Sequence, residues 1–297
     1  MPILSRLPEH VNVVEVGPRD GLQNEPVHVA PENKIAFIDA LANAGIRVIE
    51  ATSFVSPKAV PQLSDADEVF RAITPLPNVR YSVLVPNERG YDRARKAGCS
   101  AIALFTSASE QFSQKNVNAT IDETFERFAP VVERASRDGV WVRGYVSTVT
   151  DCPYSGRVSP RQAVDVATRL FELGCDEVAL ADTIGRATPK RLGALLDLAC
   201  AELPVDRLAL HLHDTEGLAL TNVMIGLDYG ITIYDAAAGG LGGCPFAPGA
   251  AGNLATEQLL KLLHGLGIET GINEDRVTDA IEQLRGAYPE LGVRNAA

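Results

Sequence analysis

The sequence has no apolar run that approaches the ~18 residues of a membrane span. Its first residues, Met1 to Pro8, also lack the apolar stretch of a signal peptide. Cysteine is scarce: the five residues, at positions 99, 152, 175, 200 and 244, form no Cys-x-x-Cys pair, so a disulfide framework is not expected. A cytoplasmic protein with free thiols is therefore expected.

Positive charge is in deficit, because 27 Lys and Arg against 38 Asp and Glu give a formal net charge of −11. The net field repels polyanions, which argues against nucleic-acid partners and anionic membrane surfaces. An anionic ligand must then be met by local donors. With 297 residues, 46% of them hydrophobic, the chain can bury a large core. Since α/β barrels of ~250 residues form single units, one domain over 1–297 is expected.

Short β-branched runs alternate with longer amphipathic segments. Eight runs predict strands: Val11–Val16, Arg47–Thr52, Val79–Val85, Ala101–Phe105, Val140–Val146, Glu177–Ala181, Arg207–His213 and Thr232–Ala237. The segments between them predict helices: Pro31–Ala44, Pro61–Ile73, Glu88–Ala97, Ile121–Arg137, Pro160–Leu173, Pro189–Ala201 and Leu218–Tyr229. Several begin with proline and end before glycine, as helices prefer.

Strict alternation of this kind implies parallel strands with right-handed crossovers, and eight of them close most naturally as a (β/α)₈ TIM barrel. The barrel is expected over about 11–270, with extra C-terminal helices at about 254–267 and 274–286. The competing doubly wound open sheet is disfavoured, because no Gly-x-Gly-x-x-Gly motif follows the first strand.

Polar and reactive residues follow several predicted strands. His211 and His213 are two apart on one strand, so both imidazoles leave it on the same face and suit a divalent metal. An isolated His-x-His pair is more often coincidental. Here, however, other strands end in charged or glycine-rich groups: Arg19 with Asp20, Glu50, Asp182 and the segment 239–245. Since the chemistry of a barrel lies at the carboxyl ends of its strands, a shared site is predicted there.

Six motifs carry a family resemblance. They are Gly17–Glu25, Ile49–Pro57, Val149–Tyr154, Ala181–Gly185, His211–Gly217 and Gly240–Asn253. Together they closely resemble the 3-hydroxy-3-methylglutaryl-CoA lyase family, over about residues 11 to 286. The resemblance implies an acyl-CoA thioester substrate, a homo-oligomer such as a dimer, and a place in leucine degradation and ketone-body formation.

The resemblance also implies a set of site residues. Metal ligands are implied at Asp20, His211, His213 and Asn253. Catalytic roles are implied for Arg19, Glu50, Asp182, His211 and Cys244, and substrate contacts for Arg19, Gln23 and Ser53. Two imidazoles, a carboxylate and an amide oxygen suit Mg²⁺ or Mn²⁺, although a two-His, one-carboxylate set also serves non-haem iron oxygenases.

These residue types fit cleavage of 3-hydroxy-3-methylglutaryl-CoA into acetoacetate and acetyl-CoA. The metal would lower the pKa of the tertiary alcohol, so that a base can take its proton and the C–C bond can break. Arg19 would hold the enolate oxygen, and Cys244, in a glycine-rich segment, would supply the proton that ends the reaction. Glu50 and Asp182 are expected to orient Arg19 or a water molecule. The other four cysteines are expected to be apolar fillers.

Three departures from the family bear on the substrate. Glu216 replaces a tyrosine, Ala236–Ala238 replaces a more hydroxylated segment, and Pro26 replaces a lysine that could meet the CoA phosphates. A longer 3-hydroxy-3-alkylglutaryl-CoA or a citramalyl-type thioester is therefore an alternative substrate. A condensing synthase of the same superfamily would use the same barrel and metal, but such enzymes usually carry a further C-terminal region. A non-catalytic binding protein is disfavoured, because the polar groups that the chemistry needs are present.

Overall fold

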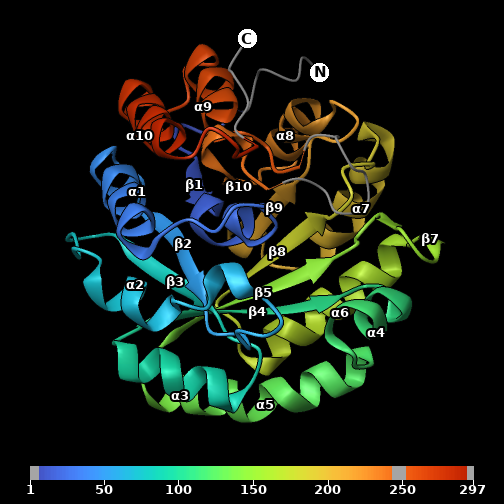
Figure 1. Cartoon of the computed structure of the whole chain (residues 1–297). Coiled ribbons are helices and arrows are strands. Elements are labelled where there is room, and N and C mark those ends of the chain that lie inside the picture. The colour runs from blue at the N-terminus through green and yellow to red at the C-terminus, as the bar shows by residue number, and fades with distance from the viewer. Residues whose placement is uncertain (1–6, 243–251, 293–297) are drawn as a thin grey trace.

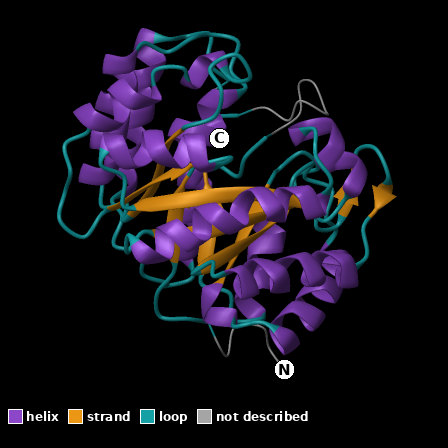
Figure 2. Ribbon diagram, turned by 90° about the horizontal axis from the view of Figure 1, so that it is seen from below, coloured by secondary structure: helices purple, strands orange, loops and turns teal. Residues whose placement is uncertain are grey.

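The computed structural model describes residues 7–242 and 252–292 and shows a closed barrel of parallel strands surrounded by helices (Figure 1, Figure 2). The barrel strands are β1 (Asn12–Glu15), β2 (Val48–Ser53), β3 (Arg80–Leu84), β4 (Ala101–Ser107), β5 (Trp141–Ser147), β8 (Glu177–Asp182), β9 (Leu208–Leu212) and β10 (Ile233–Ala236). They follow one another around the barrel in chain order, and β1 pairs with both β2 and β10 to close it. The predicted (β/α)₈ barrel is confirmed.

Helices cover the outside of the barrel, and the longer ones begin and end as their sequences predict. They are α1 (Pro31–Asn43), α2 (Ala66–Ala72), α3 (Glu88–Ala97), α5 (Ile121–Arg137), α6 (Pro160–Leu173), α7 (Pro189–Glu202), α8 (Ala219–Asp228) and α9 (Thr256–Gly265). Proline occupies the first turn of α1, α6 and α7, where its missing N–H costs nothing. At the ends of α3 and α6, Gly98 and Gly174 have φ of 96° and 115°, which favours glycine. A further helix, α10 (Glu274–Ala287), contacts α1.

The helix predicted over Pro61–Ile73 is wrong in its first half. The structure has a short 3₁₀ turn, η3 (Pro61–Leu63), and α2 begins only at Ala66. Between them, the buried ammonium of Lys34 on α1 bonds to the carbonyl of Gln62 and to both carboxylate oxygens of Asp65. This tertiary contact is absent from any local pattern.

Several short elements escaped prediction, among them a helix, a hairpin and a π-turn. Helix α4 (Glu110–Val117) follows β4 and is capped by Ser109, whose hydroxyl accepts the N–H of Phe112. A small antiparallel hairpin, β6 (Asp151–Cys152) and β7 (Gly156–Arg157), follows β5. A single π-turn, η2 (Gly17–Gly21), follows β1. All three lie at the carboxyl end of the barrel, so they shape the rim of the predicted site.

In the part of the chain that the structure describes, no helix has the length and apolar character needed to cross a membrane.

Candidate active site

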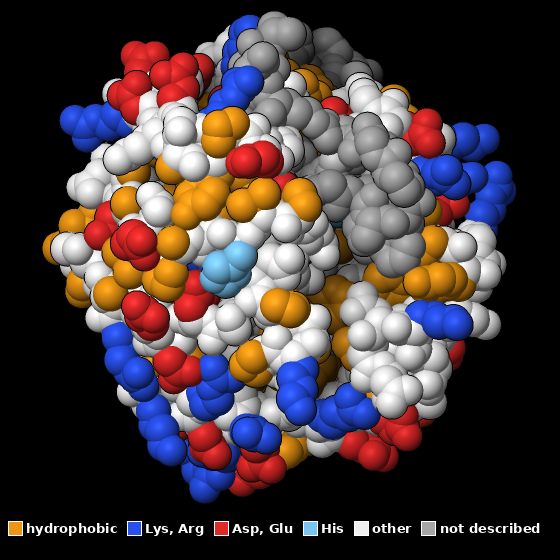
Figure 3. Space-filling model, viewed as in Figure 1, with side chains coloured by type: hydrophobic (Ala, Val, Ile, Leu, Met, Phe, Trp, Pro, Cys, Tyr) orange, Lys and Arg blue, Asp and Glu red, His pale blue; other side chains and the backbone are white. Residues whose placement is uncertain are grey.

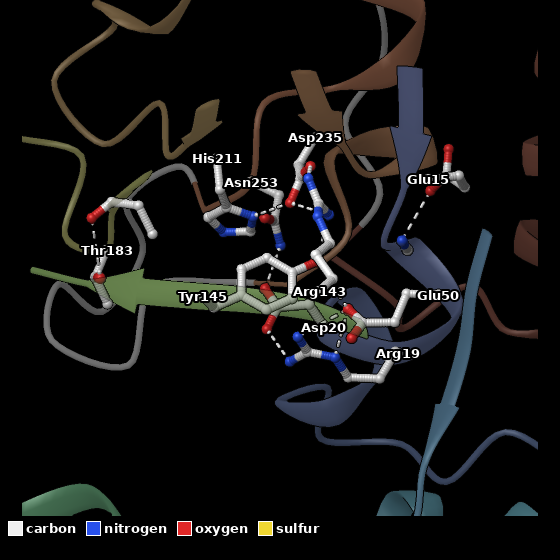
Figure 4. A network of polar contacts seen from close by, with 12 residues as sticks. Glu15, Arg19, Asp20, Glu50, Arg143, Tyr145, Thr183, His211, Asp235 and Asn253 are labelled. Carbon is white, nitrogen blue, oxygen red and sulfur yellow. Dashed lines mark hydrogen bonds and ion pairs between the residues drawn. The ribbon is translucent and has the colours of Figure 1, made fainter. Parts of the chain in front are cut away.

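A pocket of about 710 Å³ lies at the carboxyl ends of the strands. Arg19, Asp20, Gln23, His211 and His213 line it, which places five of the ten predicted site residues in one cavity. Apolar side chains also line the pocket, Phe105 of β4 and Phe112 of α4 among them. Figure 4 shows the polar residues converging from separate strands.

Asp20, His211 and His213 form a group that can hold a metal ion, because a ligand atom from each lies within 4.8 Å of the others. The turn η2 brings Asp20 there: the carbonyl of Val16 accepts the N–H groups of Arg19, Asp20 and Gly21, so the chain folds back directly after β1. Asn253 joins the group, since its Nδ2 donates to Oδ2 of Asp20 at 2.9 Å and to the carbonyl of Leu241 at 3.1 Å. Its Oδ1 is then the atom left to act as a ligand.

The two imidazoles are prepared in different ways. Nδ1 of His211 lies 3.1 Å from Oδ2 of Asp235, which leaves Nε2 to face a metal, the usual arrangement of a ligating histidine. Nδ1 of His213 is buried and has no hydrogen-bond partner within the described residues. Burial and the neighbouring His211 lower the pKa of His213 to about 3, so this ring is neutral near pH 7, as a metal ligand must be.

The carboxylate of the group is ionised. Burial opposes ionisation of Asp20, but the charge of Arg19, together with His211, His213 and the hydrogen bond from Asn253, outweighs it and lowers the pKa of Asp20 to about 2. The group thus combines two imidazoles, one of them neutral with an unpartnered buried nitrogen among the described residues, with an ionised carboxylate, and these residues fit a divalent cation.

Arg19 is only 4% exposed and is fixed by two carboxylates. Its Nε and Nη2 both lie 2.8 Å from Oε2 of Glu50, and its Nη1 donates to Oδ1 of Asp20 at 2.7 Å. Glu50 therefore orients Arg19, one of the roles predicted for it. A guanidinium held in this way keeps its charge and its direction without reorganisation.

Inside the barrel, three further side chains that the sequence analysis missed support the site. Arg143 on β5 donates to both carboxylate oxygens of Asp235 on β10, at 3.1 and 2.6 Å, and to the hydroxyl of Tyr145 at 2.7 Å. Tyr145 in turn donates to Oε2 of Glu50 at 3.3 Å. A chain of contacts thus runs from His211 through Asp235, Arg143, Tyr145 and Glu50 to Arg19 (Figure 4). A charged residue within an apolar strand run was the available signal for Arg143 and Asp235.

The remaining predicted residues occupy distinct places. The carboxylate of Asp182 accepts the N–H groups of Arg186 and Ala187 and, at 3.4 Å, the hydroxyl of Thr150, so its described contacts are to the loops around β8. The hydroxyl of Ser53 accepts the N–H of Val55 at the end of β2. Cys244 lies outside the described residues.

Three of the other four cysteines behave as predicted and one does not. Cys99 and Cys175 are buried, Cys200 is half-buried against the core, and burial raises the pKa of each thiol. Cys152 is also buried, but its sulfur accepts hydrogen bonds from the Ser109 hydroxyl and from the N–H groups of Tyr154 and Ser155. These bonds outweigh burial and lower its pKa, so Cys152 is a polar contact of the hairpin rather than an apolar filler.

Comparison with known proteins agrees with this geometry. The family model described as HMGL-like matches residues 10–284. The chain belongs to the HMGL-like family. It is 52% identical to the cytoplasmic 3-hydroxy-3-methylglutaryl-CoA lyase of Danio rerio, over 93% of this chain and 83% of that protein.

Solved structures of the family show the same architecture. The hydroxymethylglutaryl-CoA lyase of Pseudomonas aeruginosa superposes with a TM-score of 0.95 at 46% identity, covering 98% of this chain and 96% of that one. An HMG-CoA lyase of Acinetobacter baumannii, in complex with coenzyme A and 3-methylmalate, superposes with a TM-score of 0.89 at 39% identity, covering 94% and 91%. The predicted resemblance is confirmed, and with it the assignment to carbon–carbon lyases. The names of the relatives include both cytoplasmic and mitochondrial forms.

Proposed function

We propose that this protein cleaves 3-hydroxy-3-methylglutaryl-CoA to acetoacetate and acetyl-CoA. The observation that carries the proposal is the meeting of Asp20, His211 and His213 beside Arg19 at one pocket, in a chain of the HMGL-like family. A group of metal-binding residues next to a fixed cation suits a reaction that begins at an alcohol and passes through an enolate.

The proposed metal ligands are Asp20, His211, His213 and Asn253. This mixed nitrogen and oxygen set, with positions left for substrate oxygens, favours Mg²⁺ or Mn²⁺ over zinc, which prefers four tight ligands. A divalent cation bound there supplies Lewis acidity that makes the C3 hydroxyl of the substrate easier to deprotonate.

The remaining steps of the proposed reaction use side chains of the protein itself. As the hydroxyl proton leaves, the C2–C3 bond breaks, C3 becomes the ketone of acetoacetate, and the bonding pair moves into the thioester half as an enolate. Arg19, oriented by Glu50, is placed to stabilise that developing oxyanion. Protonation at C2 completes acetyl-CoA, and Cys244 is our proposed donor. Asp182, whose carboxylate binds the backbone at 186–187, holds the loop after β8 beside the pocket.

The CoA phosphates need local cations, because the chain as a whole is acidic. Lys115 and Arg127 line the pocket, on α4 and α5, and both are exposed. On the face seen in Figure 3, Lys and Arg side chains lie along the lower part of the molecule, interspersed with Asp and Glu. We propose that these two residues contribute to binding the phosphates, in place of the lysine that Pro26 replaces.

The direct test is to incubate the purified protein with 3-hydroxy-3-methylglutaryl-CoA and Mg²⁺ or Mn²⁺ and to measure acetoacetate. Chelation should abolish the activity, and either metal should restore it. No acetoacetate with metal present would refute the proposal, whereas full activity in metal-free protein would refute only the metal's role.

A second candidate substrate has a specific observation in its favour. The structure of the relative from A. baumannii is a complex with coenzyme A and 3-methylmalate, so a family member binds a methyl-branched malate derivative. That ligand carries its methyl group next to the hydroxyl carbon, whereas citramalate carries it on that carbon. A methyl-branched malyl thioester of either pattern is therefore the second substrate to assay. A preference of 100-fold or more in kcat/KM, about 2.7 kcal/mol, for this thioester or for a longer C3-alkyl homologue would overturn the substrate named above.

A further inference from the structure

Glu25 is a buried carboxylate that follows η2, and it is only 4% exposed. Its Oε1 accepts the N–H of Gly242 at 3.1 Å, and its Oε2 accepts the N–H of Gly292 at 3.0 Å. Its backbone carbonyl accepts a hydrogen bond from Nε2 of Gln62 at 3.0 Å. Burying a carboxylate is costly unless hydrogen-bond donors replace its hydration. The two N–H groups supply such charge-assisted hydrogen bonds, and the carboxylate in turn fixes the position of both backbone segments.

Gly242 is packed directly against the proposed metal ligands. Its carbonyl accepts the N–H of Asn253 at 3.2 Å. Its φ is +91°, and a Cβ there would lie 2.8 Å from Nδ2 of Asn253 and 3.1 Å from the carbonyl oxygen of Asp20. No space separates Gly242 from these two residues, so a shift of Gly242 moves Asn253.

The other end of the contact is the C-terminal segment, 288–292. The hydroxyl of Tyr288 accepts the N–H of Ala30 at 2.9 Å and Nδ2 of Asn33 at 3.2 Å, and Leu291 is buried. The segment is thus docked where α1 begins, and Gly292 reaches Glu25 from 267 residues further along the chain. The carboxylate of Glu25 therefore connects this docked segment to Gly242, next to the proposed metal ligands.

We propose that Glu25 is a positioning residue for the metal site: it ties Gly242 to the docked C-terminal segment, and Gly242 in turn sets the position of Asn253. The inference rests on the proposed function, because it takes Asn253 as a metal ligand. Glu25 is not itself one of the proposed metal ligands or substrate contacts. Through Glu25, the last described residues of the chain would help to position the metal site.

Glu25→Gln is the main test, because glutamine keeps the size of the side chain but turns one acceptor oxygen into a donor that faces an N–H. We expect Mn²⁺ binding, measured by electron paramagnetic resonance, to weaken about tenfold, the effect of losing one charge-assisted hydrogen bond. In the lyase assay, kcat at limiting Mn²⁺ should fall, saturating Mn²⁺ should restore it, and the KM for the thioester should change less than twofold.

Gly292→Pro is the second test. Proline has no N–H to donate to Oε2, and the substitution leaves Gly242 and the metal ligands untouched. The same direction of change in Mn²⁺ affinity is expected. Glu290→Gln is the matched control, because Glu290 is exposed in the same segment and loses the same charge; its Mn²⁺ affinity should equal that of the unmodified protein.

The outcomes are distinct. Weakened Mn²⁺ binding in Glu25→Gln and Gly292→Pro, with the control unchanged, supports the inference. Unchanged Mn²⁺ affinity in Glu25→Gln, accompanied by a lower melting temperature of the metal-free protein, would show a purely structural role and overturn it. If only Gly292→Pro is unchanged, the link to the C-terminal segment is wrong. If the unmodified protein does not bind Mn²⁺, the proposed metal site fails, and this inference with it.

Discussion

Arg19 is the side chain proposed to stabilise the enolate intermediate. It is buried, and its guanidinium is fixed between Glu50 and Asp20. Because its proposed work is confined to the enolate-like transition state, Arg19→Lys should lower kcat about 10²–10³-fold with little change in KM. Steady-state kinetics would check this, with Arg137→Lys as an exposed control. A large rise in KM at normal kcat would instead make Arg19 an anchor for the substrate.

Asp235 is the residue that orients His211. Its carboxylate contacts Nδ1 of the ring and is itself held by Arg143. Burial opposes ionisation of Asp235, but Arg143 and His211 together outweigh burial and keep its pKa below the usual value. In Asp235→Asn, an amide nitrogen must face either the imidazole or the guanidinium. We expect Mn²⁺ affinity to fall 10–100-fold, as for other partners of ligating histidines. Calorimetric titration would measure it, and equal affinity in Asp235→Asn and in the exposed control Asp228→Asn would refute the role.

Cys244 is distinguished from the other cysteines by chemistry rather than by observed position. The sequence places it in a glycine-rich segment beside a predicted cationic site, which favours the reactive thiolate. Burial raises the pKa of Cys99, Cys175 and Cys200. Hydrogen bonds lower the pKa of Cys152, but this thiol is only 3% exposed. One equivalent of an alkylating agent should inactivate the enzyme, and bound substrate should protect it. Cys244→Ala should retain Mn²⁺ but lose most turnover. Normal turnover in this variant would require another proton donor.

At the scale of elements, a buried lysine joins a helix to the pocket wall. Lys34 on α1 is 2% exposed, and it bonds to Asp65 and to the carbonyl of Gln62. The segment just before these residues supplies Val55, Ser56, Ala59 and Val60 to the pocket. The contact therefore links the packing of α1 to the shape of the substrate cavity.

Lys34→Met should destabilise the protein by about 3 kcal/mol, because removing one partner of a buried pair leaves the other charge uncompensated. Urea unfolding would measure the loss. The double variant Lys34→Met/Asp65→Asn should be less destabilised than the sum of the two single variants. Lys261→Met, at an exposed position of α9, should change stability by less than about 0.5 kcal/mol. An equally mild effect of Lys34→Met would mean that the pair contributes little.

At the scale of the whole molecule, Glu15 joins the first strand to the end of the barrel. Its carboxylate accepts the N–H groups of Gly17 and Ala238 and the hydroxyl of Thr256 on α9. Burial nevertheless raises its pKa to about 7, against these hydrogen bonds and with a smaller contribution from the charge of Glu257. Folding thus disfavours the ionised form of Glu15 relative to the unfolded chain.

This shift predicts a pH dependence of stability. Since the folded pKa lies above the unfolded value near 4.5, the stabilisation is fully present below about pH 4.5 and is lost as the pH rises to about 7. The loss amounts to about 3 kcal/mol. Glu15→Gln can still accept the two N–H groups and donate to Thr256, so its unfolding free energy should lack this decline. Urea unfolding between pH 5 and 8 would test it, and parallel curves for the two proteins would contradict it.

The sequence alone predicted the barrel and placed the proposed site residues at the ends of its strands. Strand and helix periodicity are local properties, and they placed the eight strands to within a few residues. The reactive groups lie at strand ends, where a closed parallel barrel must bring them together. The pair His211 and His213 needed only the two-residue repeat of a strand to share one face.

The tertiary structure decided what supports those groups. Asp235 meets Arg143 only because the closed barrel brings β10 within reach of β5, 92 positions away along the chain. Tyr145 lies two residues from Arg143 on β5, so those two share one face of that strand. Glu25 meets Gly242 and Gly292 only once the C-terminal segment is docked. Lys34, on α1, contacts Gln62 and Asp65, where the helix predicted over Pro61–Ile73 is interrupted. These contacts join residues far apart in the sequence, and no periodic pattern predicts such contacts. The proposed reacting groups, in contrast, lie in short motifs at the strand ends and could be predicted from them.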